Sequence, residues 1–244
     1  MEADFIPYTA TTILPKDNVL VLAPHPDDEV FACAGAIIQN VIQGNLVKVI
    51  ILTDGSAAIE HPNVDSRLQY IKLRQQESIQ AAKILGYGIP EFWGITDRCL
   101  TYDEKLLQRL CNYTNIEDIT CIYAPSLAEI HPDHAVLARL AMEVARRSKV
   151  KLIMYEVGIP LHPNMLLDIT PNLKRKKQAM DCFTSQLKIQ DYRRHILCLN
   201  GYRSYTLPPQ VTEAEAYYIF DNDITIHPWQ LFGPNQSYHN ENKH

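Results

Sequence analysis

Short, almost continuous runs of apolar residues alternate along the first two-thirds of the chain with longer segments whose apolar positions recur every three or four residues. Continuous apolar runs are typical of strands buried on both faces, and the longer spacing is typical of helices that cover a sheet. The sequence therefore predicts strands at residues 18–24, 45–55, 90–95, 118–126 and 150–158. It predicts helices at residues 28–44, 66–86, 103–114 and 134–148.

Strands that alternate with helices in this way favour a mostly parallel sheet with helices on both faces. We therefore expect a Rossmann-like α/β fold, in which ligands bind beyond the carboxyl ends of the strands. The last third is less regular and predicts strands at 166–170 and 215–220 and a helix at 171–187. Because no linker interrupts the composition, we expect one domain over residues 1–244, with a polar tail from about residue 233.

Charge and composition narrow the class of partner. A formal net charge of -5, with acids and bases mixed along the chain, lacks the basic surface that binds nucleic acid. The first 18 residues contain no apolar run long enough for a signal peptide, and the longest apolar runs are shorter than the roughly 18 residues of a membrane span. We therefore expect a cytoplasmic protein without an integral membrane segment. The six cysteines form no C-x-x-C pair, which argues against disulfides and a thiolate zinc site.

Two clusters of histidine and acid interrupt the apolar pattern where predicted strands end. PHPDDE places His25 and Asp28 three residues apart, and EIHPDH offers His131, Asp133 and His134. Because parallel strands end at one edge of a sheet, both clusters should emerge there. Two histidines and a carboxylate suit a catalytic zinc site, and Fe(II) could occupy the same set. The alternative is that the acids cap a helix and the histidines are exposed.

The two clusters together resemble the paired signature of the PIG-L/LmbE-like metal-dependent deacetylases, which remove N-acetyl groups from glucosaminyl compounds. Further segments are similar to that family in the same order: LTDG at 52–55, RQQESIQAAKILG at 74–86, TD at 96–97, LDIT at 167–170 and KKQAMDCFTSQ at 176–186. The resemblance covers residues 18 to about 220, which is nearly the whole chain.

The resemblance implies that His25, Asp28 and His134 ligate zinc. It also implies that Asp27 is the general base, which takes a proton from the attacking water and passes it to the leaving amine. Amide hydrolysis needs an activated water, a polarised carbonyl and a proton for the leaving group, so this assignment is chemically complete.

The resemblance implies roles for four more residues. A protonated His131 would face the oxyanion, and Asp133 would hydrogen-bond the His131 ring and favour its charged form. Arg74 is similar to the family's substrate-contacting arginine, and Asp97 to the loop acid that binds sugar hydroxyls. For Arg74 and Asp97, a surface ion pair or a cap is the competing interpretation.

Other polar residues have a functional and a structural interpretation. Asp54 either lines the site or forms a turn before Gly55, and of these two roles we expect the site-lining one. We expect Glu29 to support or cap rather than ligate. The basic run at residues 174–177 could meet an anionic substrate, but a charge run on a helix is usually a solvated face. Three histidines beside prolines are expected to be structural: His61, His162 and His227.

These patterns leave several functions open. The leading one is a zinc-dependent N-deacetylase that acts on a small-molecule amino-sugar conjugate. An amidase that cleaves a larger acyl group would use the same catalytic centre, and a non-catalytic sugar-binding protein could share the fold. A nucleotide-dependent oxidoreductase is disfavoured, because acids rather than G-x-G-x-x-G follow the first strand.

Overall fold

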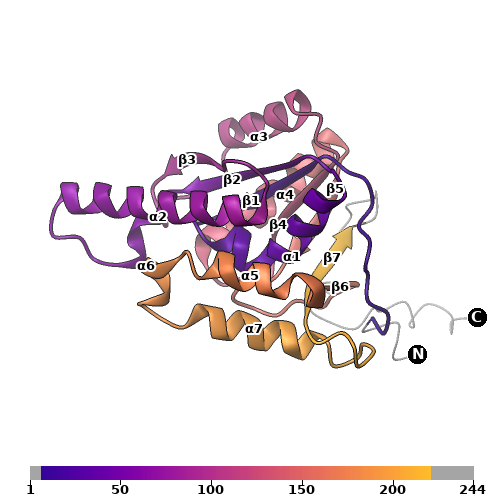
Figure 1. Cartoon of the computed structure of the whole chain (residues 1–244). Helices are drawn as coiled ribbons and strands as arrows, with labels where there is room; N and C mark the ends of the chain where they lie inside the picture. The colour runs from indigo at the N-terminus through magenta and orange to yellow at the C-terminus, as the bar shows by residue number, and fades with distance from the viewer. Residues whose placement is uncertain (1–6, 221–244) are drawn as a thin grey trace, which may run out of the picture.

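The structure is a computed structural model that describes residues 7–220, so His227 and the polar tail expected from about residue 233 lie outside the described part. In Figure 1 a sheet runs through the middle of the molecule, with helices on both of its faces. The expected Rossmann-like, mostly parallel α/β fold is therefore confirmed.

The described residues form one seven-stranded sheet, ordered β3-β2-β1-β4-β5-β7-β6. Its strands are β1 (Val19–Ala23), β2 (Val47–Thr53), β3 (Glu91–Ile95), β4 (Cys121–Pro125), β5 (Lys151–Tyr155), β6 (Met165–Asp168) and β7 (Ala214–Phe220). The first five strands of the sequence run parallel, whereas β7 pairs antiparallel with both β5 and β6. β7 therefore lies inside the sheet, between two strands that precede it in the sequence.

β1 shows why the strands read as continuous apolar runs. Val19, Val21 and Ala23 pack into the core on one face of the sheet, and Leu20 and Leu22 pack into the core on the other. All five residues are buried, because helices cover both faces and leave no position of β1 for a polar side chain.

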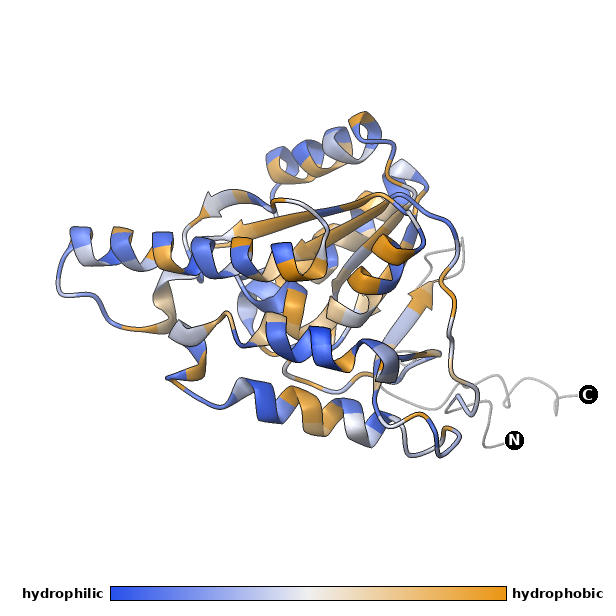
Figure 2. Cartoon of the chain, in the orientation of Figure 1, coloured by the Kyte–Doolittle hydropathy of each residue, from blue (hydrophilic) through white to orange (hydrophobic). Residues whose placement is uncertain are grey.

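The helices form two layers. They are α1 (Asp28–Ile42), α2 (Val64–Leu85), α3 (Glu104–Ile116), α4 (Pro132–Ser148), α5 (Leu173–Met180), α6 (Thr184–Leu187) and α7 (Tyr192–Arg203), with 3₁₀ turns at Ser56–Ala58 and Thr170–Asn172. α3 and α4 pack on one face, and α1, α2, α5 and α7 on the other. Figure 2 shows apolar strands between helices that are polar on their outer sides. Among residues 7–220, no helix has the length and apolar character of a membrane span.

The less regular C-terminal third differs from expectation in its helices. The helix expected at 171–187 is divided into α5 and α6 by a turn around Phe183, whose side chain is fully buried in the core. α7 was not predicted, because its apolar positions form no clear stripe and few of its residues are buried. The basic run at 174–177 is not simply a solvated face, since Lys176 is fully buried.

Candidate active site

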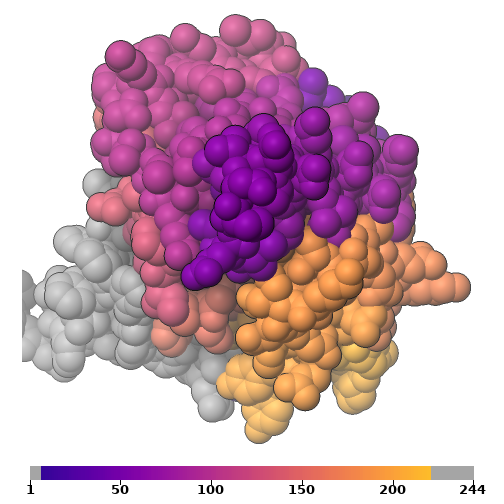
Figure 3. All heavy atoms as spheres, turned by 90° about the vertical axis from the view of Figure 1, so that its left-hand side faces the viewer, coloured from indigo at the N-terminus to yellow at the C-terminus, as the bar shows by residue number. Residues whose placement is uncertain are grey.

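The two histidine and acid clusters meet at the carboxyl ends of β1 and β4, the adjacent strands where the order of the sheet changes direction. Their connections lead to opposite faces of the sheet, which leaves a crevice between them. The crevice here is a cavity of about 340 Å³, to which the C-terminal third contributes Gln186, Ile189 and Tyr192. Figure 3 faces the left-hand edge of Figure 1, where N-terminal segments in purple meet the orange segment that contains α6.

Donor atoms of His25, Asp28 and His134 form a nearly equilateral triangle. Asp28 Oδ2 lies 3.2 Å from His25 Nδ1 and 3.2 Å from His134 Nε2, and the two ring nitrogens are 3.3 Å apart. Donors bound at about 2.0–2.1 Å to a tetrahedral zinc ion lie about 3.3–3.4 Å from one another. The three atoms therefore fit one face of such a tetrahedron and leave a position for water or substrate.

The outward nitrogens of both histidines face carboxylates, as is usual for histidines that bind metals. His25 Nε2 lies 3.2 Å from both Asp133 Oδ2 and Asp97 Oδ1. His134 Nδ1 lies 3.4 Å from Glu129 Oε2. These contacts fix the orientation of both rings. The other nitrogen of each ring, which is Nδ1 in His25 and Nε2 in His134, therefore faces Asp28 and forms a corner of the triangle.

The protein's own charges favour protonated histidines and an ionised Asp28. Burial lowers the pKa of His25, but Asp133 and Asp28 outweigh it and raise the pKa well above its usual value. Burial also lowers the pKa of His134, yet Asp28 raises it to about 9. For Asp28, burial raises the pKa, and the two histidines hold it well below its usual range. A divalent cation would compete with protons for these donors.

Asp27 lines the same cavity and has a different chemistry. Burial raises its pKa to about 7, although the nearby Arg74 guanidinium acts to lower it. Its backbone φ of 144° lies in a region that L-residues rarely adopt, which marks local strain of the kind found at functional sites. Its backbone N–H donates to Glu29 Oε2 at 3.0 Å, and burial raises the pKa of Glu29 to about 8. Glu29 thus supports the strained turn.

The contact expected between the Asp133 carboxylate and the His131 ring is corrected by the structure. The Asp133 carboxylate accepts hydrogen bonds from the backbone N–H groups of Arg98, at 2.8 Å, and Leu100, at 3.2 Å, and it contacts His25. Asp133 follows Pro132 in the first turn of α4, which directs its carboxylate toward the loop after β3.

His131 caps the N-terminus of α4 with its ring. Its Nδ1 accepts a hydrogen bond of 3.2 Å from the Asp133 backbone N–H, so a neutral ring carries its proton on Nε2. Burial lowers the pKa of His131, and the charges of His25 and His134 lower it further. The neutral form is therefore favoured over the charged form that the sequence predicted. A ligand atom of His131 also lies within 4.8 Å of those of His25 and His134.

Arg74, expected to bind substrate, has its hydrogen-bond donors directed at the protein. Only 2% of the residue is exposed. Its guanidinium donates to Asp27 Oδ2 at 2.9 Å, to the Gly55 carbonyl at 2.7 Å and to the Pro26 carbonyl at 2.6 Å. Gly55 has a φ of 61°, and a Cβ there would overlap the guanidinium. Arg74 therefore ties the turn after β2 to the turn after β1.

Asp97 lines the cavity, whereas Asp54 does not. Asp97 accepts a hydrogen bond of 2.9 Å from the Ala57 backbone and faces His25, which lowers its pKa to about 2 against the effect of burial. Asp54 accepts from the backbone N–H groups of Ser56 and Asp97 and pairs with Arg67 at 2.8 Å. Asp54 therefore forms a turn, and the site-lining role expected for it is corrected by the structure.

Three polar residues of the cavity were missed as site residues in the sequence, and one of them is Gln186, which was quoted only as part of a family-like segment. Glu129 precedes the second cluster and is only 5% exposed, and Arg98 is an exposed residue that follows Asp97. Burial of Glu129 could not be read from sequence, because glutamates in loops are usually exposed. The cavity also has an apolar side that no motif announced, formed by Phe31, Ala57, Ala58, Ile130, Val157, Ile189 and Tyr192.

Comparison with known proteins adds to this geometry. The sequence model of the family described as "PIG-L: GlcNAc-PI de-N-acetylase" matches residues 20–145, which contain both clusters. The chain is 26% identical over 209 residues to a "4-oxalmesaconate hydratase" of Pseudomonas putida, covering 77% of this chain and 81% of that protein. It is 24% identical over 198 residues to a "Probable N-acetyl-alpha-D-glucosaminyl L-malate deacetylase 2" of Bacillus anthracis, covering 72% of this chain and 85% of that one.

A solved structure shares the fold. The N,N'-diacetylchitobiose deacetylase of Pyrococcus horikoshii superposes with a TM-score of 0.74 at 21% sequence identity, covering 84% of each chain. At this identity the similarity establishes the arrangement of helices and strands.

Proposed function

Because the chain belongs to the PIG-L (GlcNAc-PI de-N-acetylase) family, we propose that it is a zinc-dependent hydrolase that removes an N-acetyl group from an N-acetylglucosaminyl or related amino-sugar conjugate. The observation that carries this proposal is the triangle of His25, Asp28 and His134 donors, with the Asp27 carboxylate in the same cavity. A divalent ion held by that triangle would polarise the amide carbonyl and lower the pKa of a water molecule.

In this proposal Asp27 moves the protons. A carboxylate whose pKa lies at about 7 accepts a proton from the attacking water and releases it to the leaving nitrogen at little cost near neutral pH. Arg74 holds Asp27 Oδ2, so the other carboxylate oxygen is the one available for proton transfer. Arg74 is then a positioning residue for the base rather than a contact to the sugar.

His131 stabilises the oxyanion as a neutral donor. Its Nδ1 is occupied by the α4 backbone, so the Nε2–H is the group that can donate to the developing negative charge. Asp133 has an indirect role in this proposal. Its carboxylate holds the proposed ligand His25 and the loop that carries Arg98 and Leu100.

The cavity supports a small acyl group and a charged remainder of the substrate. A volume of about 340 Å³ is near the lower end of the range for small-molecule sites, which favours acetyl over a long acyl chain. Asp97 lines the cavity, and we propose that its carboxylate accepts a hydrogen bond from a sugar hydroxyl. Within residues 7–220, Arg98 lines the cavity and makes no ion pair, so we propose that it binds an acidic group of the conjugate. The relatives named for a malate conjugate and for oxalmesaconate support an acidic substrate.

Hydration of an unsaturated carboxylic acid is the second candidate. The P. putida relative, named a hydratase, matches a larger share of this chain than the B. anthracis deacetylase does. An activated water and a proton-transferring Asp27 would serve the addition of water to a double bond as well as amide hydrolysis.

The deciding experiment measures acetate release from N-acetylglucosamine and N-acetylglucosaminyl malate, and octanoate release from an N-octanoyl analogue, each with and without a chelator. We expect chelator-sensitive release of acetate and faster turnover of the malate conjugate than of the free sugar. Oxalmesaconate is offered in parallel and followed by its ultraviolet absorbance. Consumption of oxalmesaconate without acetate release would replace the deacetylase with the hydratase. Turnover unchanged after complete metal removal would reject both.

A further inference from the structure

We propose that Glu129 is a positioning residue that sets the metal-binding nitrogen of His134 and ties it to the loop that forms one wall of the cavity. This inference rests on the proposed function in one respect, namely that His134 binds a metal. Glu129 lies in the connection between β4 and α4, and the loop is the one between β5 and β6.

The Glu129 carboxylate is buried among backbone donors. Its Oε1 accepts hydrogen bonds from the N–H groups of Val157 at 2.7 Å, Gly158 at 3.0 Å and Ile159 at 3.3 Å. Its Oε2 lies 3.2 Å from the Gly158 nitrogen and 3.4 Å from His134 Nδ1. One carboxylate therefore contacts three successive residues of the loop and a proposed metal ligand.

The contact to His134 selects a tautomer. A carboxylate that accepts several N–H groups stays an acceptor, so it favours a proton on the facing His134 Nδ1. The proton that a cation displaces is therefore the one on Nε2, on the side of the triangle with Asp28 and His25. Carboxylates behind histidine ligands fix ring orientation and raise metal affinity in this way.

The contact to the loop extends the effect to the cavity. Val157 and Gly158 both line it, so the oxygen atoms that orient His134 also hold a wall against which the substrate lies. Gly158 approaches closely enough that a Cβ there would lie 3.1 Å from Glu129 Oε2. The position of this wall and the orientation of His134 are therefore linked through one side chain.

Glu156 provides a matched control. It is as buried as Glu129, and its Oε2 accepts a hydrogen bond of 2.9 Å from the Leu161 backbone in the same loop. Its other partner is Arg203, at 2.9 Å, and it has no contact with His134. A purely structural anchor of this loop would behave like Glu156.

The test compares zinc affinity, by competition with a chelator, in the wild type, Glu129→Gln and Glu156→Gln. Glutamine keeps an oxygen for the loop amides but turns an NH₂ donor toward His134 Nδ1, which drives the ring proton to Nε2. We expect Glu129→Gln to weaken zinc binding about 10- to 100-fold and to alter the absorption spectrum of the Co(II)-substituted protein. We expect Glu156→Gln to stay within about threefold of the wild type while hydrogen exchange in residues 157–161 accelerates.

Gly158→Ala is the second variant, because the added Cβ displaces the Glu129 carboxylate without removing it. We expect it to weaken zinc binding by less than tenfold. It provides a test even if Glu129→Gln does not fold. Equal zinc affinity in Glu129→Gln and wild type, or an equal loss in Glu156→Gln, would overturn the inference. Wild-type protein that binds zinc without releasing acetate would remove the proposed function and leave the role of Glu129 intact. Wild type without zinc affinity would overturn both.

Discussion

The three consecutive acids after β1 differ in chemistry because each has different neighbours. Asp28 faces two histidines that hold its pKa well below the usual range, although burial raises it. Burial dominates for Asp27 and Glu29 and raises their pKa values to about 7 and about 8. At the scale of the residue, these different contacts support the three roles that we propose for adjacent carboxyl groups: cation binding by Asp28, proton transfer by Asp27 and support of the turn by Glu29.

Asp27→Asn should retain zinc and lose most turnover. The amide keeps the size of the side chain but cannot accept a proton, and general-base catalysis contributes about 100- to 10,000-fold. Acetate release and bound zinc are measured on the same preparation. Asp65→Asn, a matched change at an exposed position on α2, should match the wild type in both. An Asp27→Asn enzyme with the wild-type rate would assign the base to another group.

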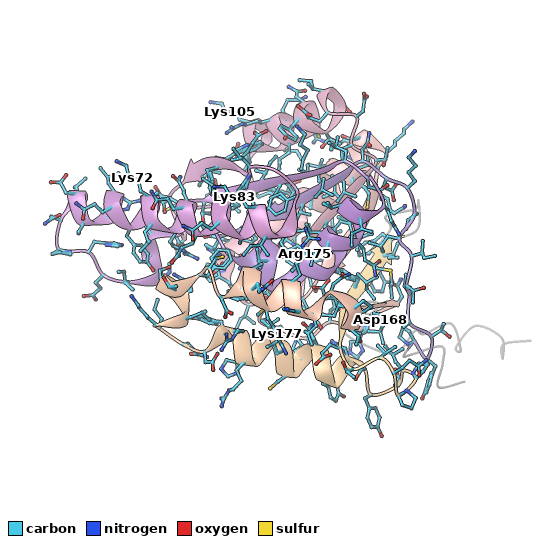
Figure 4. The ribbon with its side chains drawn as sticks, viewed as in Figure 1. Lys72, Lys83, Lys105, Asp168, Arg175 and Lys177 are labelled. Carbon is cyan, nitrogen blue, oxygen red and sulfur yellow. The ribbon has the colours of Figure 1, made fainter. Side chains whose placement is uncertain are left out.

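Arg98→Ala should raise KM for an acidic conjugate about 10-fold or more, since charge-assisted hydrogen bonds are worth about 1.5–3 kcal/mol. KM for neutral N-acetylglucosamine should change by less than about twofold. Steady-state kinetics on both substrates give this comparison. Lys72→Ala removes the same charge from an exposed position on α2 outside the cavity (Figure 4) and should change neither KM. Equal effects of Arg98→Ala on both substrates would contradict an ionic role.

The residues of the candidate site were predictable from sequence to different degrees. His25, Asp28 and His134 form two short motifs at strand ends, and a parallel sheet brings such ends together. The partners of Asp133 and the burial of Glu129 depend on loops from β3 and β5, whose paths follow no sequence periodicity. The sequence thus indicates which side chains can take part in chemistry, whereas the tertiary structure decides which partners each of these side chains contacts.

At the scale of elements, a buried ion pair joins α5 and β7. Lys176 Nζ lies 2.7 Å from Glu215 Oε1, and both residues are at most 1% exposed. Glu215 also accepts hydrogen bonds from the backbone N–H groups of Gly35 at 2.8 Å and Ala36 at 2.9 Å in α1. Gly35 has no side chain, which permits this approach, since a Cβ would overlap Glu215 and Ile169. The Glu215 carboxylate therefore connects β7 to both α5 and α1.

Lys176→Met should destabilise the protein by about 3–5 kcal/mol, because it leaves the buried Glu215 charge without its partner. Urea unfolding followed by circular dichroism measures the change. Lys174→Met, at an exposed position of the same helix, should change stability by less than about 0.5 kcal/mol. The double variant Lys176→Met with Glu215→Gln should recover part of the loss. Equal stability of both single variants would mean that the pair contributes nothing.

The strands were easier to predict than the C-terminal helices for a physical reason. A strand covered on both faces is apolar at every position, and this pattern is visible in the sequence, as β1 shows. α5 and α6 are short and are separated by a turn around the buried Phe183, and few residues of α7 are buried. Figure 4 shows Arg175 and Lys177 on α5, where a basic run suggested a uniform solvated face. Burial of the intervening Lys176 depends on Glu215, which is 39 residues away.

At the scale of the whole molecule, the proposed ligands come from two separate connections. His25 and Asp28 follow β1, His134 lies in α4, and roughly 100 residues separate the two groups. An ion bound to all three would join the connections that lead to opposite faces of the sheet. Metal binding should therefore stabilise the native state as a whole rather than one loop.

Zinc at about 100 times its Kd should stabilise the wild type by about 2.7 kcal/mol, which corresponds to roughly 5–10 °C in Tm for a chain of this size. His134→Ala should show a shift of less than about 2 °C, because only two donors of the triangle remain. Differential scanning calorimetry with chelator, and with zinc above the chelator concentration, gives both values. An equal zinc shift in the two proteins would place the ion elsewhere.

The position of β7 has a consequence for synthesis on the ribosome. β7 lies between β5 and β6, so within residues 7–220 β6 joins the rest of the sheet through a strand that is made about 50 residues later. Glu215, the partner of the buried Lys176 and of α1, arrives with β7. Since residues leave the ribosome at about 5–20 per second, the nascent chain exposes the edge of β5 and an unpaired lysine for several seconds. An exposed strand edge can pair with another chain, so this interval favours aggregation of the nascent protein.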